Sequence, residues 1–276
     1  MKARLNRLLA EDGRCLDVAV DHGLFGEPSL LLGIEDMVAT VRALVDGAPD
    51  AIQLSPGQAP LLQVLPGPRK PALVLRADVA NVYAQDLPRT PFSDVLEAAT
   101  THAVQLDAAC LCVNLLMMED QPELYRQCVR NVSGIVAMAE PVGMPVMVEP
   151  LALRRSNGRY LLDGNAQTIA ALVRQAVELG ADVIKADPTD DLNQYPQVIQ
   201  AAGRCPLLVR GGSRVGDRQM LQRAQAVMAH GAAGIVYGRN IIQHDKPIAA
   251  TRALMAIVHQ GASVATALKL IRDSAR

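Results

Sequence analysis

Short apolar runs recur along the chain, and each is followed by polar or glycine-rich residues and then by an amphipathic stretch. Eight such runs cover residues 16–20, 51–54, 72–76, 109–113, 145–149, 182–186, 206–210 and 234–237. Their apolar residues are consecutive instead of alternating with polar ones, which is typical of parallel strands buried on both faces. The pattern therefore predicts eight buried strands.

The stretches between the runs have helical periodicity. Residues 34–47, 165–180 and 224–231 each place apolar side chains on one face and end at a glycine. Eight strand–helix units of about 30 residues predict an α/β fold, the (β/α)8 TIM barrel. An open doubly wound sheet is the alternative, but no GxGxxG motif follows the first run. No linker or composition shift is present, so we expect a single domain over residues 1–276. The proline-containing segment 87–92 is expected to form a loop over the barrel mouth.

Composition excludes several function classes. Twenty-seven basic residues oppose 28 acidic ones, and aromatic residues make up only 3% of the chain, so neither a basic surface nor stacking platforms for nucleic acid are expected. No apolar run reaches the roughly 18 residues that span a bilayer, and the N-terminus lacks a signal-peptide pattern. We therefore expect a cytoplasmic protein without membrane or nucleic-acid partners. The five cysteines lack zinc-site spacing, which predicts buried thiols and neither a metal nor a cofactor.

A barrel places its functional residues where the strands end. Lys185 lies inside the apolar run DVIKAD, where a lysine must either pair with a carboxylate or lose its proton. A deprotonated lysine is the nucleophile for Schiff-base formation with a ketone; the alternative is a structural ion pair with Asp187 or Asp21. Asp21 ends the run VAVD and either pairs with Lys185 and moves protons or forms a cap or salt bridge. His22 binds a substrate hydroxyl or holds its own loop.

Two glycine-rich turns follow the last two runs. RGGSRV at 210–215 and YGRNI at 237–241 stand where barrels build phosphate sites from backbone N–H groups. Gly211, Gly212 and Gly238 let the backbone approach an anion, and Arg239 adds a charge-assisted contact. Ser213 either donates to the anion or caps a helix. Ordinary tight turns are the alternative interpretation. Strand ends also carry residues to which the sequence assigns no role: Gln53, Arg76, Asp78, Asn114 and Arg210.

These motifs together resemble a known family. VDHG at 20–23, GADVIK at 180–185, RGGS at 210–213 and GIVYGRNIIQHDKP at 234–247 are similar to the class I (Schiff-base) aldolases, the DeoC- and FbaB-like aldolases. That family includes archaeal-type fructose-bisphosphate aldolase, autoinducer-2 processing thiolase and aminodideoxyheptulosonate synthase. The resemblance implies a metal-independent barrel, a Schiff-base lysine at Lys185 and an acid/base aspartate at Asp21. It also implies a phosphorylated substrate bound at the two turns, and a homo-oligomer, often a decamer.

The chain departs from this family after its fifth run. Archaeal-type aldolases place an acid/base tyrosine there, and the matching position falls near Leu151 in VEPLALRRSNGRY. Glu149 is the predicted replacement, since a buried carboxyl can shuttle protons; Tyr160 lies farther along. Asp187 is expected to contact the substrate or to lie in a solvated loop. Three arginines either clamp a second anion or form a solvated face: Arg154, Arg155 and Arg159.

Three functions are consistent with these residues. The first is a lyase, an aldehyde-lyase that reversibly cleaves a phosphorylated ketose through a Schiff base at Lys185. The second is a transferase that passes a carbon fragment or acyl group from the same adduct to an acceptor. The third is a non-catalytic barrel that senses a sugar phosphate, although a sensor has no need for a lysine in an apolar strand.

Overall fold

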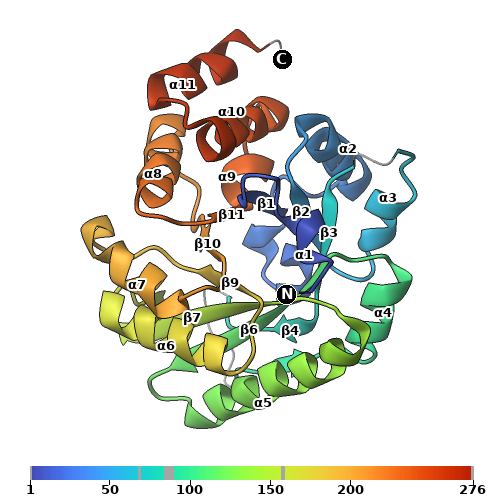
Figure 1. Ribbon diagram of the computed structural model, residues 1–276, viewed down its shortest axis with the longest axis vertical. Helices are drawn as coiled ribbons and strands as arrows, with labels where there is room; N and C mark the ends of the chain where they lie inside the picture. Colours follow the sequence, from blue (N-terminus) through green and yellow to red (C-terminus); the bar gives the residue numbers. More distant parts are fainter. Residues whose placement is uncertain (1, 68–69, 84–89, 157–158, 275–276) are drawn as a thin grey trace.

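The eight predicted strands form a closed barrel in the computed structural model, which describes residues 2–67, 70–83, 90–156 and 159–274. Within these residues, eight parallel strands pair in the order β6-β3-β2-β1-β11-β10-β9-β7, and β6 pairs with β7 to close the ring. The strands are β1 (Cys15–Ala19), β2 (Ala51–Leu54), β3 (Ala72–Arg76), β6 (Cys110–Met118), β7 (Val146–Ser156), β9 (Val183–Ala186), β10 (Leu207–Arg210) and β11 (Gly234–Tyr237). The predicted (β/α)8 barrel is confirmed (Figure 1).

Helices surround this barrel. They are α2 (Met37–Gly47), α3 (Ala59–Gln63), α4 (Ala99–Gln105), α5 (Pro122–Ala139), α6 (Ala166–Glu178), α7 (Tyr195–Ala202), α8 (Asp217–Ala229), α10 (Pro247–Gln260) and α11 (Val264–Asp273). The predicted helices at 34–47, 165–180 and 224–231 correspond to α2, α6 and α8, and α8 begins earlier, at Asp217. Caps fix the other two starts: Asp36 accepts a hydrogen bond from the N–H of Ala39, and Asn165 accepts from Gln167 and Thr168. No helix of the described ranges is both long and apolar enough to cross a membrane.

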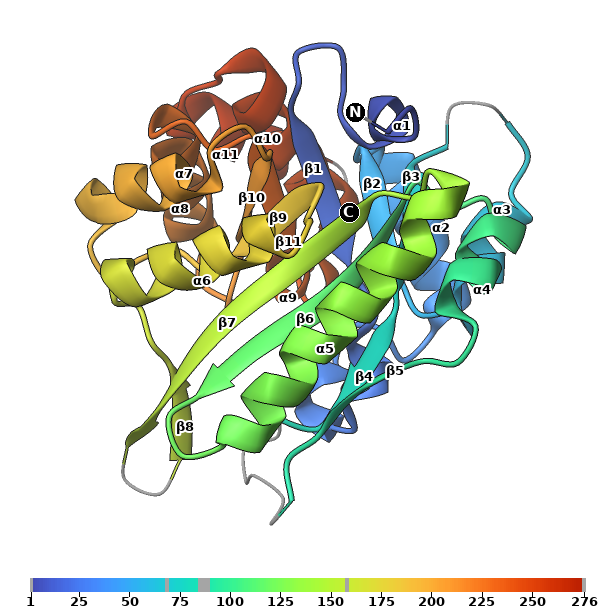
Figure 2. The same ribbon diagram turned by 60° about the horizontal axis from the view of Figure 1, so that its bottom comes forward.

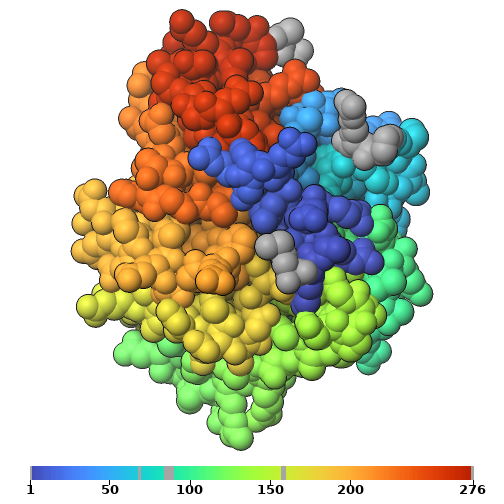
Figure 3. Space-filling view, in the orientation of Figure 1, coloured from blue at the N-terminus to red at the C-terminus, as the bar shows by residue number. Residues whose placement is uncertain are grey.

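Strand periodicity divides the core into two layers. One side of each strand packs against the helices, and the other side faces the barrel interior. At the N-terminal end the interior is filled by small side chains, such as Cys15, Ala51 and Ala72, and by leucines of the short helix α1 (Leu5–Leu8). Figure 3 shows the N-terminal segment lying across the middle of this face. Because this end is filled, polar side chains gather at the opposite end.

Two regions differ from the sequence expectation. The fifth strand, predicted to end at residue 149, continues to Ser156 and pairs antiparallel with β8 (Arg159–Leu162). It does so because β6 is also long, so the two strands stay paired from Leu111↔Val146 to Met118↔Leu153 (Figure 2). In the third unit, β4 (Asp78–Ala80) pairs with β5 (Ser93–Val95). Of the expected mouth loop at 87–92, residues 87–89 lie outside the described residues.

Short 3-10 helices complete the connections. They are η1 (His22–Phe25), η2 (Pro28–Leu30), η3 (Glu140–Val142) and η4 (Leu192–Gln194). The first two follow β1 directly and lie over the C-terminal end of the barrel, where Phe25 and Leu30 are buried. The four-residue helix α9 (Arg239–Ile242) follows β11 at the same end. This end of the barrel therefore holds the candidate site.

Candidate active site

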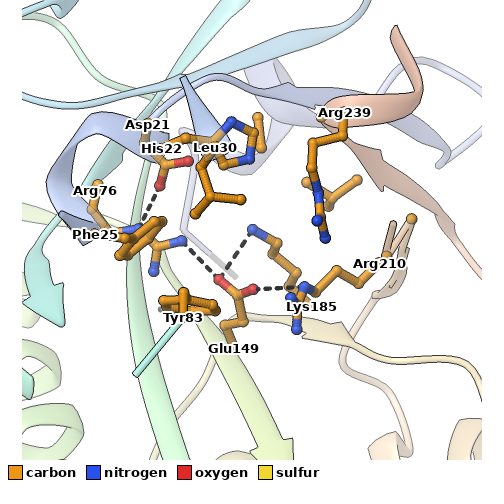
Figure 4. A pocket seen from close by; sticks show the side chains of 15 residues that line it. Asp21, His22, Phe25, Leu30, Arg76, Tyr83, Glu149, Lys185, Arg210 and Arg239 are labelled. Atoms are coloured by element: carbon orange, nitrogen blue, oxygen red, sulfur yellow. Dashed lines mark hydrogen bonds and ion pairs between the residues drawn. The ribbon is translucent and has the colours of Figure 1, made fainter. Parts of the chain in front are cut away.

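A pocket opens at the C-terminal ends of the strands and collects most of the predicted site residues. It is lined by Ala19, Asp21, His22, Phe25, Leu30, Arg76, Tyr83, Glu149, Lys185, Arg210, Gly211, Gly212, Val236, Gly238 and Arg239. Figure 4 shows its charged side chains converging from several strands. Of the ten site residues predicted from the sequence, all line this pocket except Ser213 and Asp187.

Lys185 extends from β9 into the barrel and is only 4% exposed. Its Nζ lies 3.0 Å from Oε2 of Glu149 and donates to Oε1 of Gln53 at 3.3 Å. The lysine therefore pairs with a carboxylate, as burial of an ammonium requires. The partner is Glu149, and not Asp187 or Asp21, the two that the sequence suggested.

Glu149 points into the pocket from β7 and stands among three cations (Figure 4). Besides Lys185, it has two arginine partners. Nη2 of Arg76 donates to its Oε2 at 2.7 Å, and Nε of Arg210 lies 3.3 Å from its Oε1. Burial opposes its ionisation, but the positive charges of Lys185, Arg76 and Arg210 prevail and hold its pKa below the usual range. The resting group is therefore a carboxylate.

Asp21 is linked to Glu149 through one guanidinium. Nε of Arg76 donates to Oδ2 of Asp21 at 2.6 Å, while Nη1 donates to Oδ1 of Asp78 at 3.2 Å. The same Asp21 oxygen accepts from Nε2 of Gln53 at 2.6 Å. Burial raises the pKa of Asp21, but Arg76 and Lys185 outweigh burial and lower it. Both predicted acid/base groups are therefore anionic and share Arg76.

The two glycine turns lie side by side beside Lys185. A Cβ on Gly211 would stand 2.6 Å from the ring of Tyr237, and one on Gly238 would stand 2.7 Å from the carbonyl oxygen of Ala19. Gly212 has a φ of +64°, a conformation that favours glycine. The space of a side chain at Gly211 and Gly238 is thus filled by neighbouring residues, so both positions require glycine, whereas the space beside Gly212 is open.

An asparagine connects the two turns. Nδ2 of Asn240 donates to the carbonyl oxygens of Gly211 at 3.1 Å and Ser213 at 3.2 Å, and its Oδ1 accepts from the N–H of Val215 at 3.0 Å. Arg239, the residue before it, faces the pocket and is half-buried. The arrangement joins glycine-rich backbone and a guanidinium at one place, which suits an anion.

The remaining predicted residues take different positions. His22 lines the pocket, where burial lowers its pKa to about 4, so the imidazole is neutral. Ser213 is exposed and lies outside the residues that line the pocket. Asp187 does not belong to the pocket lining and accepts a hydrogen bond from Nη1 of Arg210 at 3.2 Å. Burial raises its pKa, although the positive charge of this arginine opposes the shift. Its observed contact is with Arg210 and not with the pocket.

Sequence reasoning gave no role to several residues of the site. Arg76 and Arg210 sit inside apolar runs, as Lys185 does, and that shared signal identifies them. Asp17 carries the same signal in LDVAV; it is fully buried, and neither carboxylate oxygen has a hydrogen-bond partner within the described ranges. Tyr83 follows β4 in an irregular segment and carried no such signal, yet its hydroxyl donates to Oδ1 of Asn114 at 2.8 Å.

Arg154 and Arg155, two of the three arginines after the fifth run, do not belong to the pocket lining, and the side chain of Arg159 lies outside the part of the chain that the structure describes. Arg154 and Arg155 are exposed on the β7–β8 hairpin, and Arg155 pairs with Asp120 at 3.1 Å. The hydroxyl of Tyr160 also bonds to Asp120, so this tyrosine does not reach the site. Within the described ranges, no group of three or more His, Cys, Asp or Glu side chains is placed to hold a metal ion.

Comparisons with known proteins agree with this geometry. Two solved structures share the fold at a TM-score of 0.78: a Schiff-base-forming fructose-1,6-bisphosphate aldolase, 23% identical and covering 94% of this chain and 99% of that one, and an archaeal fructose-1,6-bisphosphate aldolase whose catalytic lysine carries a carbinolamine intermediate, 22% identical and covering 93% and 98%.

Curated relatives cover nearly the whole chain. An uncharacterized aldolase of Saccharolobus solfataricus is 30% identical and covers 96% of both chains. The 2-amino-3,7-dideoxy-D-threo-hept-6-ulosonate synthase of Halobacterium salinarum is 30% identical, covering 96% of this chain and 94% of the relative. A 3-hydroxy-5-phosphonooxypentane-2,4-dione thiolase of Yersinia pseudotuberculosis is 29% identical, covering 98% and 86%. The profile of the DeoC/LacD family aldolases matches residues 15–244. The chain therefore belongs to the DeoC/LacD family of aldolases.

Proposed function

We propose that this protein is a class I aldolase that reversibly cleaves a phosphorylated ketose through a Schiff base at Lys185. One observation carries the proposal: a buried lysine points into the pocket, 3.0 Å from a carboxylate and beside two glycine turns. The amine, a proton acceptor and an anion site are the three parts that iminium chemistry on a sugar phosphate needs.

In the proposed reaction, Glu149 takes the proton of the Lys185 ammonium. The neutral amine attacks the keto carbon and forms a carbinolamine, and Glu149 returns the proton to the departing hydroxyl, so that water and an iminium result. A carboxylate then removes the proton from the hydroxyl on the carbon beyond the scissile bond. The scissile bond breaks and an aldehyde leaves. The electron pair of the broken bond moves toward the iminium and forms an enamine. The enamine is protonated at carbon, and the resulting iminium is hydrolysed.

The two carboxylates have separate positions for these transfers. Glu149 contacts Lys185 directly and is assigned the transfers at nitrogen and at the substrate hydroxyl. Asp21 faces the pocket from the end of β1 and is assigned the protonation of the enamine. As an anion, it first takes up from water the proton that Glu149 removed from the substrate hydroxyl and released. Arg76 contacts both groups and stabilises both anions. The single guanidinium thereby keeps two proton acceptors ionised inside a buried site.

Borohydride reduction with a panel of ketose phosphates tests the nucleophile. Mass spectrometry of the wild type should find the retained fragment on Lys185, and Lys185→Arg should give no adduct, since a guanidinium does not deprotonate. Lys269→Arg, at an exposed lysine, is the matched control and should be trapped like the wild type. An adduct in Lys185→Arg would overturn the assignment, and no adduct in the wild type would favour the non-catalytic sensor.

Glu149→Gln tests the proton acceptor. The variant keeps the shape of the side chain and loses its basicity, so kcat should fall by roughly 10²–10⁴-fold, the usual contribution of a positioned acid/base. Slow trapping of a ketone at Lys185 should persist on long incubation. Near-normal turnover by this variant would assign the proton transfers to another group.

A transferase using the same adduct is the second candidate. It is favoured by the relatives, because a thiolase and a synthase are as similar to this chain as the aldolase is. Product analysis with and without an acceptor separates the two: a lyase releases both fragments without an acceptor, whereas a transferase turns over only with one. EC class 4.1.2 applies to the first outcome.

The anion site is proposed at Gly211, Gly212, Gly238 and Arg239. Arg239→Ala should raise KM for a phosphorylated substrate at least tenfold with a smaller change in kcat, because the contact is shared by ground and transition states. An unchanged KM would place the phosphate elsewhere. A single barrel domain over residues 1–276, a cytoplasmic location and homo-oligomeric assembly are further proposals, which rest on the sequence and its resemblance.

A further inference from the structure

The charges that line the pocket are mostly neutralised within the protein. Arg76 bonds to Asp21, Asp78 and Glu149. Arg210 bonds to Glu149 and Asp187, and Lys185 bonds to Glu149. These cations already have anionic partners, so they offer little net attraction to a charged substrate.

Arg239 is the exception. Within the described ranges, it is the one arginine or lysine of the pocket lining whose side chain makes no hydrogen bond or ion pair. Burial lowers its pKa, and the nearby charge of Arg210 acts in the same direction. A half-buried guanidinium without a partner is an anion site, and it stands beside the glycine turns.

Within the described residues, the opposite side of the pocket carries two aromatic rings, and the arginines beside them, Arg76 and Arg210, are already paired with carboxylates. Arg239 begins α9, which follows β11. Three strands separate β11 from β6 in either direction around the barrel, and Tyr83 bonds to Asn114 on β6. The rings of Tyr83 and Phe25 lie 4.3 Å apart between centroids. Figure 4 shows this pair across the pocket from Arg239, with Lys185 and Glu149 between them.

We propose that the substrate carries one phosphate group, held by Arg239 and the glycine turns, and that its other end is uncharged and packs against Phe25 and Tyr83. This rests on the proposed Schiff-base function. The substrate class is a ketose monophosphate or a related monophosphorylated ketone. A bisphosphate is disfavoured, because its second phosphate would be desolvated against two aromatic rings and would face the carboxylate of Glu149.

The hydroxyls of such a substrate still find partners. The hydroxyl of Tyr83 and the imidazole of His22 both belong to the pocket lining, and Nδ1 of His22 is buried without a hydrogen-bond partner within the described ranges. Neutral donors and acceptors of this kind suit sugar hydroxyls and not a dianion. These polar groups and the unpaired side chain of Arg239 therefore select the same substrate class.

Measured kcat/KM values for three probes test the proposal: a ketohexose 1-phosphate, the 6-phosphate and the 1,6-bisphosphate, such as those of fructose and tagatose. The better monophosphate should exceed the bisphosphate of the same sugar at least tenfold. A bisphosphate used as well as, or better than, both monophosphates would overturn the proposal.

A variant that leaves Arg210 with one carboxylate partner in place of two makes the test specific. Asp187→Asn removes a carboxylate partner of Arg210, whose guanidinium lies 5.9 Å from the ring centroid of Tyr83. The monophosphate-to-bisphosphate ratio of kcat/KM should fall at least threefold in this variant. Asp94→Asn, at an exposed aspartate of β5 outside the pocket lining, should leave the ratio unchanged. A ratio that is equal in both variants and the wild type would contradict the charge argument.

Borohydride trapping distinguishes this inference from the proposed function. If no phosphate ester is trapped at Lys185, the Schiff-base function itself fails. If the bisphosphate is trapped and cleaved as readily as the monophosphates, the function stands and the single-phosphate inference fails. Because the ratio is taken within one variant, a general loss of activity or folding cancels from it.

Discussion

Asp17 provides a test of how burial controls a charge inside this barrel. Its side chain lies on the interior side of β1, on the same face as Cys15 and Ala19 of the interior cluster, and it is fully buried. Neither oxygen has a hydrogen-bond partner within the described ranges. Burial raises its pKa to about 7, although the positive charge of Lys185 opposes the shift. This carboxyl is therefore largely protonated below pH 7 and about half protonated at pH 7.

The shift has a defined effect on stability. At pH values between 3.8, the ordinary pKa of the group, and about 7, its pKa in the folded protein, the folded protein holds a proton that the unfolded chain has released. The free energy of unfolding should therefore fall as pH rises through this window, by about 1.4 kcal/mol for each pH unit and roughly 4 kcal/mol in total, and level off above it. Asp17→Asn has nearly the same shape and no titration, so it should lack this contribution.

The assay is urea unfolding of the wild type and of Asp17→Asn at a series of pH values from about 5 to 8. The stability of the variant relative to the wild type should increase by about 3 kcal/mol over this range, most of it below pH 7. Any constant cost of the amide cancels, because only the pH dependence of the difference is used. Parallel pH profiles for the two proteins would refute the reasoning.

Three further predictions concern other parts of the chain. The protonated imidazole of His259 donates to the carboxylates of Asp50 and Asp12, which raises its pKa. The stabilisation is complete below the pKa of the unfolded state and is lost as pH rises through the pKa of the folded state. In urea unfolding, His259→Gln should therefore cost on the order of 1 kcal/mol more at pH 6 than at pH 9. Gly238→Ala should destabilise the protein by about 1–3 kcal/mol and raise KM for phosphate esters, because its Cβ would stand 2.7 Å from the carbonyl oxygen of Ala19. Chelator treatment should leave activity unchanged; loss of activity that zinc restores would contradict the Schiff-base mechanism.

The sequence by itself determined the barrel and the position of its chemistry. Consecutive apolar residues in eight runs required strands buried on both faces, and helical periodicity between them required covering helices. Lys185 was identifiable because a charge inside an apolar run is costly without a special partner. The glycines at 211, 212 and 238 were identifiable because an anion site at strand ends needs exposed backbone. Each of these signals is local, so each is readable along the chain.

Only the tertiary structure decided which groups meet. Lys185 pairs with Glu149 because barrel closure brings β7 beside β9, with Met147 paired to Val183. Arg76 reaches both Asp21 and Glu149 because strands distant in sequence project their side chains into one interior. Tyr83 enters the pocket from an irregular segment that has no periodicity to predict its direction. Periodicity reports which side chains are buried, but the contacts between buried charges depend on strand order, register and closure of the ring.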